Sequence, residues 1–287
     1  MFAIANTWQF NLLISLICAV LFSQFYKLSV KNAIKDGAVT IILQLIAGLS
    51  VLIWIPFFKL QFPTNISTYL LLLVAIVFYA INDRLQTTVR KHLEVSVFTI
   101  IKQLSTVFII IIGLTVFREP LVITKIIGAT LILLGNIFLF YTKKGFNVNK
   151  YVLLSIVANI TFAIALSTDI GISNLFNLPI YISTTLVVPA LMIFLAEKIS
   201  ISSIIEEYKL GNMKYYYVTG ITWGLFILFF LRSFNFGQVT TIVPLQSTSV
   251  LLNVIVAYFF LKERSNLVKK IAVAIIVIAG IYLTVLN

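Results

Sequence analysis

The chain has 287 residues, of which 61% are hydrophobic and 10% are charged, and its formal net charge at pH 7 is +12. These polar side chains are too few to cover the surface of a soluble domain of this size. The composition therefore excludes a water-soluble globular protein and predicts a protein that lies in a bilayer. The basic residues lie in short connections between apolar runs, which is typical of membrane topology rather than of nucleic-acid binding, and we expect no nucleic-acid partner.

Ten apolar runs follow one another along the chain, separated by short polar breaks. Each run is long enough to cross about 30 Å of hydrocarbon as a helix, so the sequence predicts an all-α integral membrane fold. The first run lacks the basic segment and cleavage site of a signal peptide, and we expect it to remain as a helix. The predicted helices span residues 7–27, 38–58, 67–83, 94–117, 121–141, 151–170, 179–197, 214–232, 238–261 and 266–286.

The two halves of the chain resemble each other at an offset of 144 residues. Phe117-Arg118-Glu119 precedes one apolar run, and Leu261-Lys262-Glu263 precedes its counterpart. Each half holds five predicted helices, and an odd number makes the second half enter the membrane from the opposite side. We therefore expect two domains, residues 1–143 and 144–287, that form inverted five-helix repeats with a substrate path between them.

Most of the 21 Lys and Arg side chains lie in the connections between predicted helices 1 and 2, 3 and 4, 5 and 6, 7 and 8, and 9 and 10. Positively charged connections are retained on the cytoplasmic side of a membrane. The charge distribution alone therefore places both termini outside the cytoplasm.

In each half, the turn with Phe or Leu before Glu119 or Glu263 is followed by a glycine-containing helix, with Gly128 and Gly135 in the first copy and Gly280 in the second. This pattern resembles the EamA-type branch of the drug/metabolite transporter superfamily. The resemblance implies ten helices in two five-helix repeats and transport of a metabolite. It also implies termini in the cytoplasm, opposite to the charge distribution. Members often carry a proline where Ser105 and Ser249 stand here.

A second similarity is to the nucleotide-sugar transporters of the same superfamily. In those proteins a tyrosine, a small residue and an asparagine end the third helix, and the fourth helix carries a polar Gln and Lys. Tyr79-Ala80-Ile81-Asn82 and Lys102-Gln103 are similar here, with a different order of Gln and Lys.

Lys102 lies eight residues into the fourth predicted helix, near Gln103 and Ser105, and the corresponding stretch of the ninth contains Gln246 and Ser249. An ionisable side chain at this depth is costly and usually faces a cavity or a partner. We expect the five residues to bind substrate, with Lys102 neutralising an anionic group. The alternatives are that Lys102 reaches an interface about 12 Å away, and that the two Gln side chains only join helices.

Ser23-Gln24 in the first predicted helix and Ser167-Thr168 in the sixth coincide at the same offset. The family resemblance implies that these helices also border the cavity, so the four residues are further candidates for substrate binding. Asp169 follows them and is a candidate proton-coupling or counter-ion carboxylate. Its position near the end of the predicted helix favours the alternative, a solvated loop residue.

Three further positions have competing interpretations. Asn82, with Asp83, closes the third predicted helix and either contacts substrate or caps the helix at the headgroups. Trp223, halfway along the eighth, either lines a cavity, where an indole can stack on a ring or cover a cation, or packs in the core. Glu119 and Glu263 are expected to accept backbone N–H bonds at helix N-termini.

Small residues in the fifth and tenth predicted helices, such as Gly128, Gly135 and Ala274, allow close helix contacts within the chain or between two copies. The protein is thus expected to be a monomer or a homodimer.

One histidine (His92), one cysteine (Cys18) and nine carboxylates provide no catalytic triad, metal-ligand spacing or nucleotide loop, so we expect no enzyme, metal or cofactor. The favoured hypothesis is a secondary transporter of the cell (inner) membrane that moves a small polar or amphipathic metabolite by alternating access. Its expected partners are that small-molecule substrate and the lipid bilayer. The alternatives are a flippase for a lipid or lipid-linked sugar and a non-transporting membrane scaffold.

Overall fold

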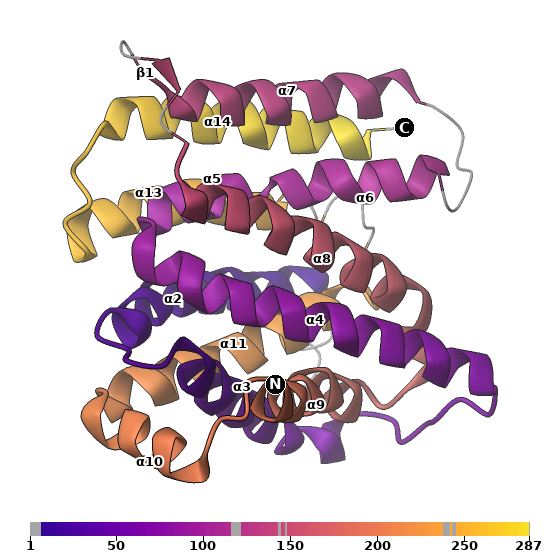
Figure 1. Cartoon of the computed structure of the whole chain (residues 1–287). Helices are drawn as coiled ribbons and strands as arrows, with labels where there is room; N and C mark the ends of the chain where they lie inside the picture. The colour runs from indigo at the N-terminus through magenta and orange to yellow at the C-terminus, as the bar shows by residue number, and fades with distance from the viewer. Residues whose placement is uncertain are drawn as a thin grey trace.

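The computed structural model describes residues 7–115, 122–142, 145–146, 148–237, 242 and 245–286. Helices dominate this part of the chain (Figure 1). They are α2 (Trp8–Val30), α3 (Asp36–Leu52), α4 (Ile66–His92), α5 (Val95–Lys102), α6 (Leu104–Thr115), α7 (Ile123–Phe140), α8 (Lys150–Ile172), α9 (Leu178–Ala196), α10 (Ile201–Leu210), α11 (Met213–Ser233), α13 (Ser249–Phe260) and α14 (Leu267–Val285), with 3-10 turns η1 (Ile55–Phe57) and η2 (Ser173–Leu175). A small antiparallel hairpin, β1 (Tyr141–Thr142) and β2 (Gly145–Phe146), lies between α7 and α8.

The helices have the length and composition of membrane spans. Among the described residues, eight helical segments are long and apolar enough to cross a membrane, and two shorter apolar helices cover residues 36–52 and 245–260. Large apolar side chains such as Leu70, Ile123 and Phe259 are exposed on the outside of the molecule, where lipid would cover them. The chain is an integral membrane protein, as its composition predicts.

Three parts of the predicted helix layout are wrong. The second predicted helix, 38–58, is α3, which ends at Leu52 and is followed by the 3-10 turn η1. The third predicted helix, 67–83, is α4, which runs on to His92. Its last turns are polar, which is typical of a connection, although most of their polar side chains face the interior. The break predicted before the eighth helix contains α10, a ten-residue helix. This helix is too short and too polar to cross a membrane, so it does not form an apolar run in the sequence.

The fourth and ninth predicted helices are each interrupted at corresponding places. A turn at Gln103 separates α5 from α6, with the Gln103 N–H donating to the Ile100 carbonyl (3.0 Å). A turn at Thr248 precedes α13, and its N–H donates to the Leu245 carbonyl (3.1 Å). Ser105 Oγ also donates to the Lys102 carbonyl (2.8 Å). Such bonds compete with the regular helical ladder, so the fourth predicted helix breaks without a proline. In the ninth, Pro244 lies four residues before the turn at Thr248.

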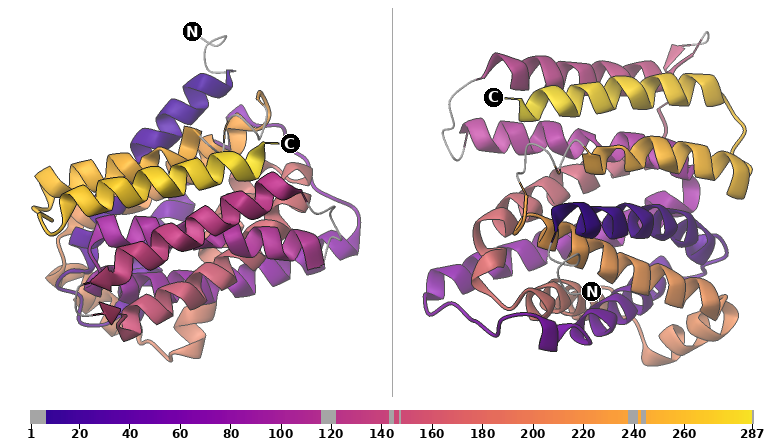
Figure 2. Two further views of the ribbon diagram at one scale, coloured as in Figure 1. Left: turned by 90° about the horizontal axis from the view of Figure 1, so that it is seen from above. Right: turned by 180° about the vertical axis from the view of Figure 1, so that it is seen from behind.

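Helices from the two halves pair throughout the molecule. α2 packs on α11, α4 on α8, α3 on α9, α5 on α13 and α7 on α14. The last pair lies at one edge, and α10 lies at the opposite edge (Figures 1 and 2). α7 and α14 approach closely because both carry glycine, and a Cβ atom on Gly280 would lie 2.7 Å from the carbonyl oxygen of Gly128. The small residues therefore serve a contact within the chain, one of the two uses predicted for them.

Candidate functional site

The second half of α4 carries a polar stripe that faces the interior. Its members recur at the three- and four-residue spacing of one helix face. Asn82 is 2% exposed, Asp83 is 4% exposed and Arg90 is 2% exposed, so the stripe is deeply buried among apolar helices. The stripe consists of Tyr79, Asn82, Asp83, Gln86, Thr87 and Arg90.

Asn82 and Asp83 form a hydrogen-bonded network inside the molecule. The Asp83 carboxylate accepts from the side-chain amides of Gln44 on α3 (2.9 Å) and of Asn82 (2.7 Å). Gln86 donates to the Asn82 amide oxygen (2.9 Å). The prediction that Asn82 and Asp83 close the third helix is therefore wrong, because both lie within α4 and away from its ends.

Lys102 ends α5 and is half-buried. Its Nζ lies 4.8 Å from the centre of the Phe162 ring on α8, within the range of a cation–π contact. The neighbouring side chains bond locally, since Gln103 donates to the Thr99 carbonyl (3.3 Å) and Ser105 to that of Lys102. The amino group thus lies over an aromatic face in the interior.

Gln246 lies against α2, and Ser249 is the first residue of α13. Ser15 Oγ donates to Gln246 Oε1 (3.0 Å). Gln24 donates to the side-chain oxygen of Asn253 (3.0 Å), and Asn253 donates to the Ser249 carbonyl (2.9 Å). Asn253 thus links Gln24 of α2 to the backbone of Ser249, and Gln246 is joined to α2 through Ser15.

Two more predicted residues of these helices carry buried polar atoms. Ser23 on α2 is buried, and Oε1 of its neighbour Gln24 has no hydrogen-bond partner among the described residues. Both lie on the side of α2 that faces the interior of the molecule.

Asp169 is a buried residue of α8, 5% exposed. Its carboxylate accepts hydrogen bonds from the hydroxyls of Tyr79 on α4 (2.6 Å) and of Tyr181 on α9. The interpretation of Asp169 as a solvated loop residue is therefore wrong. Of its neighbours, Thr168 donates to the Ile164 carbonyl (3.0 Å), and the buried Ser167 Oγ has no hydrogen-bond partner in the described part of the chain.

Trp223 belongs to the core. Its indole stacks on Phe22, with ring centroids 5.3 Å apart, and lies 5.9 Å from the Tyr26 ring. Only 7% of the side chain is exposed, so the structure agrees with core packing, the second of its two interpretations.

Glu263 accepts backbone N–H bonds, but from a helix of the other half. Its carboxylate accepts from the N–H groups of Val95 (2.7 Å) and Ser96 (3.0 Å), at the N-terminus of α5, and from Ser96 Oγ (2.6 Å). Beside it, Glu94 forms an ion pair with Lys270 of α14. The expected capping role is present, although the capped helix is α5 instead of α14. Glu119 lies outside the described residues.

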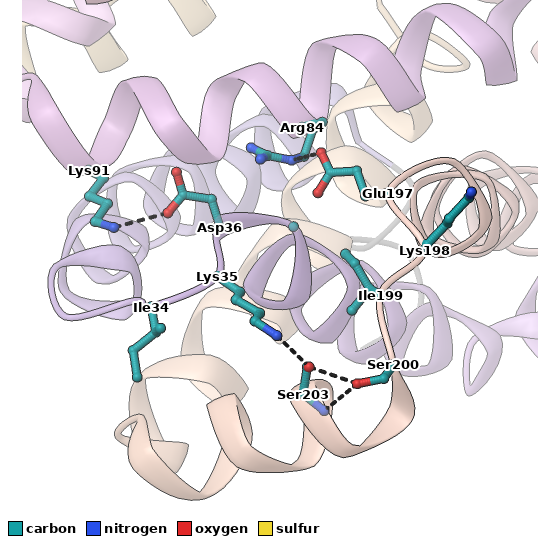
Figure 3. A pocket seen from close by; sticks show the side chains of 11 residues that line it. Ile34, Lys35, Asp36, Arg84, Lys91, Glu197, Lys198, Ile199, Ser200 and Ser203 are labelled. Atoms are coloured by element: carbon teal, nitrogen blue, oxygen red, sulfur yellow. Dashed lines mark hydrogen bonds and ion pairs between the residues drawn. The ribbon is translucent and has the colours of Figure 1, made fainter.

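A pocket of about 460 Å³ lies at one end of the molecule, beside the start of α3 and the α9–α10 connection (Figure 3). Four of its charged side chains form two ion pairs, and a lysine bonds a serine hydroxyl. Arg84 bonds Glu197, Lys91 bonds Asp36 (3.1 Å), and Lys35 donates to Ser203 (2.6 Å). None of the predicted substrate-binding residues lines this pocket.

Tyr79 and Tyr181 were not predicted as partners of Asp169, and Arg90 was assigned to a connection. The signal for Tyr79 and Arg90 was available, because the polar residues from 79 to 90 follow a helical spacing. No comparable pattern marks Tyr181, which reaches Asp169 from another helix.

Comparisons with known proteins are consistent with this fold. One solved crystal structure superposes with a TM-score of 0.52 at 14% sequence identity, covering 94% of this chain and 97% of the other. At this identity the likeness concerns the fold alone. None of the curated proteins matches the sequence. Residues 6–141, about the first predicted repeat, match the model of the EamA-like transporter family.

Proposed function

We propose that the protein is an EamA-type secondary transporter of the cell (inner) membrane, which moves a small polar or amphipathic metabolite by alternating access. One observation carries the proposal: Asp83, Arg90 and Asp169 are each at most 5% exposed, inside a bundle of apolar helices. Ionisable groups at such positions are costly and typically mark a transport path. The match of residues 6–141 to a transporter family supports the same conclusion.

The helix pairing supports two inverted repeats, residues 1–143 and 144–287. α3 with α9 and α7 with α14 are pairs of corresponding helices, and α2 with α11 is the counterpart of α8 with α4. α5 and α13, which also pack together, are parts of the fourth and ninth predicted helices, which correspond to each other. A two-fold axis in the membrane plane generates this set of pairs. The division into two repeats, with ten membrane-spanning helices, is therefore part of the proposal.

In this proposal the substrate lies near the two broken helices. Lys102, Gln103 and Ser105 come from the first break and Gln246 and Ser249 from the second. Transporters of this design place their sites at helix breaks, because unwound backbone supplies extra hydrogen-bonding groups. The other candidate substrate contacts are Ser23, Gln24, Ser167, Thr168, Asn82 and Trp223.

Asp169 is the proposed coupling group. Two tyrosine hydroxyls hold its carboxylate between α4, α8 and α9, so a proton gained or lost there changes contacts between the two halves. The substrate class is left to experiment, and the similarity of the α4 and α5 motifs to nucleotide-sugar transporters stays a prediction.

Flux into proteoliposomes tests the proposal. The purified chain should accelerate uptake of at least one member of a panel of labelled amino acids, sugars, nucleotide sugars and quaternary amines, and Lys102→Ala should reduce that uptake. Flipping of a labelled lipid without soluble flux would favour a flippase for a lipid or lipid-linked sugar. A folded protein with neither activity would favour the scaffold alternative.

A further inference from the structure

Arg90 is a cation enclosed by aromatic rings. Its guanidinium carbon lies 4.0 Å from the centre of the Phe98 ring on α5, and 4.7 Å and 4.9 Å from those of Tyr26 and Phe22 on α2. Aromatic faces attract a guanidinium electrostatically and leave its N–H groups at the edge free for other partners. The rings therefore hold the group in place without using its hydrogen-bond donors.

Two donor nitrogens of this guanidinium have no partner among the described residues, one on each of the two edges that Nη2 shares with Nε and with Nη1. Nε and Nη1 of Arg90 are buried, and no acceptor among the described residues receives a hydrogen bond from either atom. A buried donor without a partner is costly, and the cost is greater for a charged group. Arg is also the side chain that best matches a planar oxyanion with two parallel bonds. The donors thus point to a ligand with that geometry.

No described carboxylate neutralises Arg90 by direct contact. Asp83 acts on it electrostatically, but lies two turns away on α4, about 10 Å along the axis. Both Asp83 oxygens accept hydrogen bonds from amides. Lys102 is near enough to Arg90 for the two charges to repel. An anion bound to Arg90 would relieve this repulsion.

The backbone that carries Arg90 is also fixed. Lys27 Nζ donates to the carbonyls of Arg90 (2.8 Å), Lys91 (2.9 Å) and Leu93 (2.8 Å), at the end of α4. These bonds satisfy helix-terminal carbonyls and place a cation at the negative end of the helix. The position of the guanidinium is therefore set from both its ring contacts and its main chain.

We propose that Arg90 binds an oxyanion, a carboxylate or phosphate group of the transported molecule, through two parallel hydrogen bonds, with Lys102 as the second positive charge. This inference rests on the proposed transport function and narrows its substrate to an anionic one. The same chemistry occurs in soluble metabolites and in lipid headgroups, so the experiment separates the two sources.

Binding to the full chain tests the inference. In a neutral detergent, thermal shift and titration calorimetry compare benzoate with benzamide and glycerol 3-phosphate with glycerol. We expect at least one charged probe to bind better than its uncharged counterpart. Arg90→Gln should weaken that binding roughly ten- to a hundredfold, because it removes charge-assisted bonds. Arg90→Lys keeps the charge without the fork and should give an intermediate loss.

Arg84→Gln is the matched control, since Arg84 lies on the same helix and pairs with Glu197 in the surface pocket; it should leave binding unchanged. Wild-type affinity in Arg90→Gln, or no preference for either charged probe, would overturn the inference. If Arg90→Gln does not fold, wild-type affinity in Arg90→Lys has the same meaning.

A competition experiment shows whether the oxyanion comes from a lipid headgroup or from a soluble metabolite. If phosphatidylglycerol in phosphatidylcholine nanodiscs competes with the soluble probe in the wild type, the oxyanion belongs to a headgroup; without competition it belongs to a soluble metabolite. Flux of an uncharged substrate with no preference for oxyanions would overturn this inference and leave the transport proposal standing. Oxyanion binding without flux of any substrate would overturn the transport proposal and leave the oxyanion site at Arg90 standing.

Discussion

Replacing Glu263 by Gln tests how firmly the two halves are held together at one end. The Glu263 carboxylate lies in the α13–α14 connection and receives three hydrogen bonds from Val95 and Ser96 at the start of α5. Glutamine keeps a single acceptor oxygen, and its NH₂ group then faces N–H and O–H donors. The variant Glu263→Gln therefore loses the charge and at least one acceptor while keeping the shape of the side chain.

The size of the effect follows from those contacts. Hydrogen bonds to a charged group contribute about 1.5–3 kcal/mol each, and a carboxylate near a helix N-terminus adds roughly 0.5 kcal/mol. Two bonds go to Glu263 Oε2, the atom replaced if the new oxygen takes the place of Oε1. The lowest of these values give about 3.5 kcal/mol, so we expect Glu263→Gln to lower the free energy of unfolding by at least about 3.5 kcal/mol, which is roughly 7 to 14 °C in Tm.

Thermal melting of the purified full-length chain in detergent measures this change. Glu206→Gln is the control, because Glu206 is an exposed carboxylate on α10, and it should leave Tm nearly unchanged. Equal Tm values for the two variants would show that the bonds from Glu263 to α5 do not stabilise the protein, and the reasoning would be refuted.

Three further predictions concern packing, coupling and orientation. Gly280→Ala places a Cβ atom 2.7 Å from a backbone oxygen of α7, so it should lower the free energy of unfolding by about 1–3 kcal/mol. The control is Gly171→Ala, which has nothing within 4 Å of its Cβ and should leave the stability unchanged. Equal melting temperatures for the two variants would contradict the close contact. Asp169→Asn should make uptake into proteoliposomes insensitive to an imposed pH gradient, and an unchanged response would remove Asp169 from coupling. In a variant without the native cysteine, the charge distribution predicts that a cysteine at Asn174 reacts with an impermeant maleimide from outside and one at Lys209 does not; the opposite result would place the termini in the cytoplasm.

The membrane class and most helix positions could be predicted from the sequence, because burial in lipid requires long apolar runs whatever the tertiary structure. The prediction was wrong where polar side chains of a helix face the interior of the protein, because composition alone does not show which way a side chain points. The last turns of α4 resemble a connection by composition, yet Asp83 and Arg90 point inward. Arg90 was accordingly counted as a basic residue of a connection, although it lies in the interior.

Contacts between segments that are distant in the chain could not be predicted from the sequence. Nothing local to Asp169 indicates that Tyr181 and Tyr79 donate to it, because the three residues come from different helices. The position of Glu263 before a helix correctly predicted a carboxylate that accepts backbone N–H bonds. It could not predict that the acceptor serves α5, since that depends on how the halves pack.

The helix break at Gln103 differs in kind from a proline kink. A proline permanently removes an N–H group and clashes with the preceding turn, whereas the residues around Gln103 keep every backbone donor and the Ser105 hydroxyl donates to the Lys102 carbonyl. In the other broken helix, Pro244 lies four residues before Thr248. Exchanging a hydroxyl bond for a regular helical one costs about 1 kcal/mol, so the break at Gln103 does not fix its helix in one bent form as a proline would.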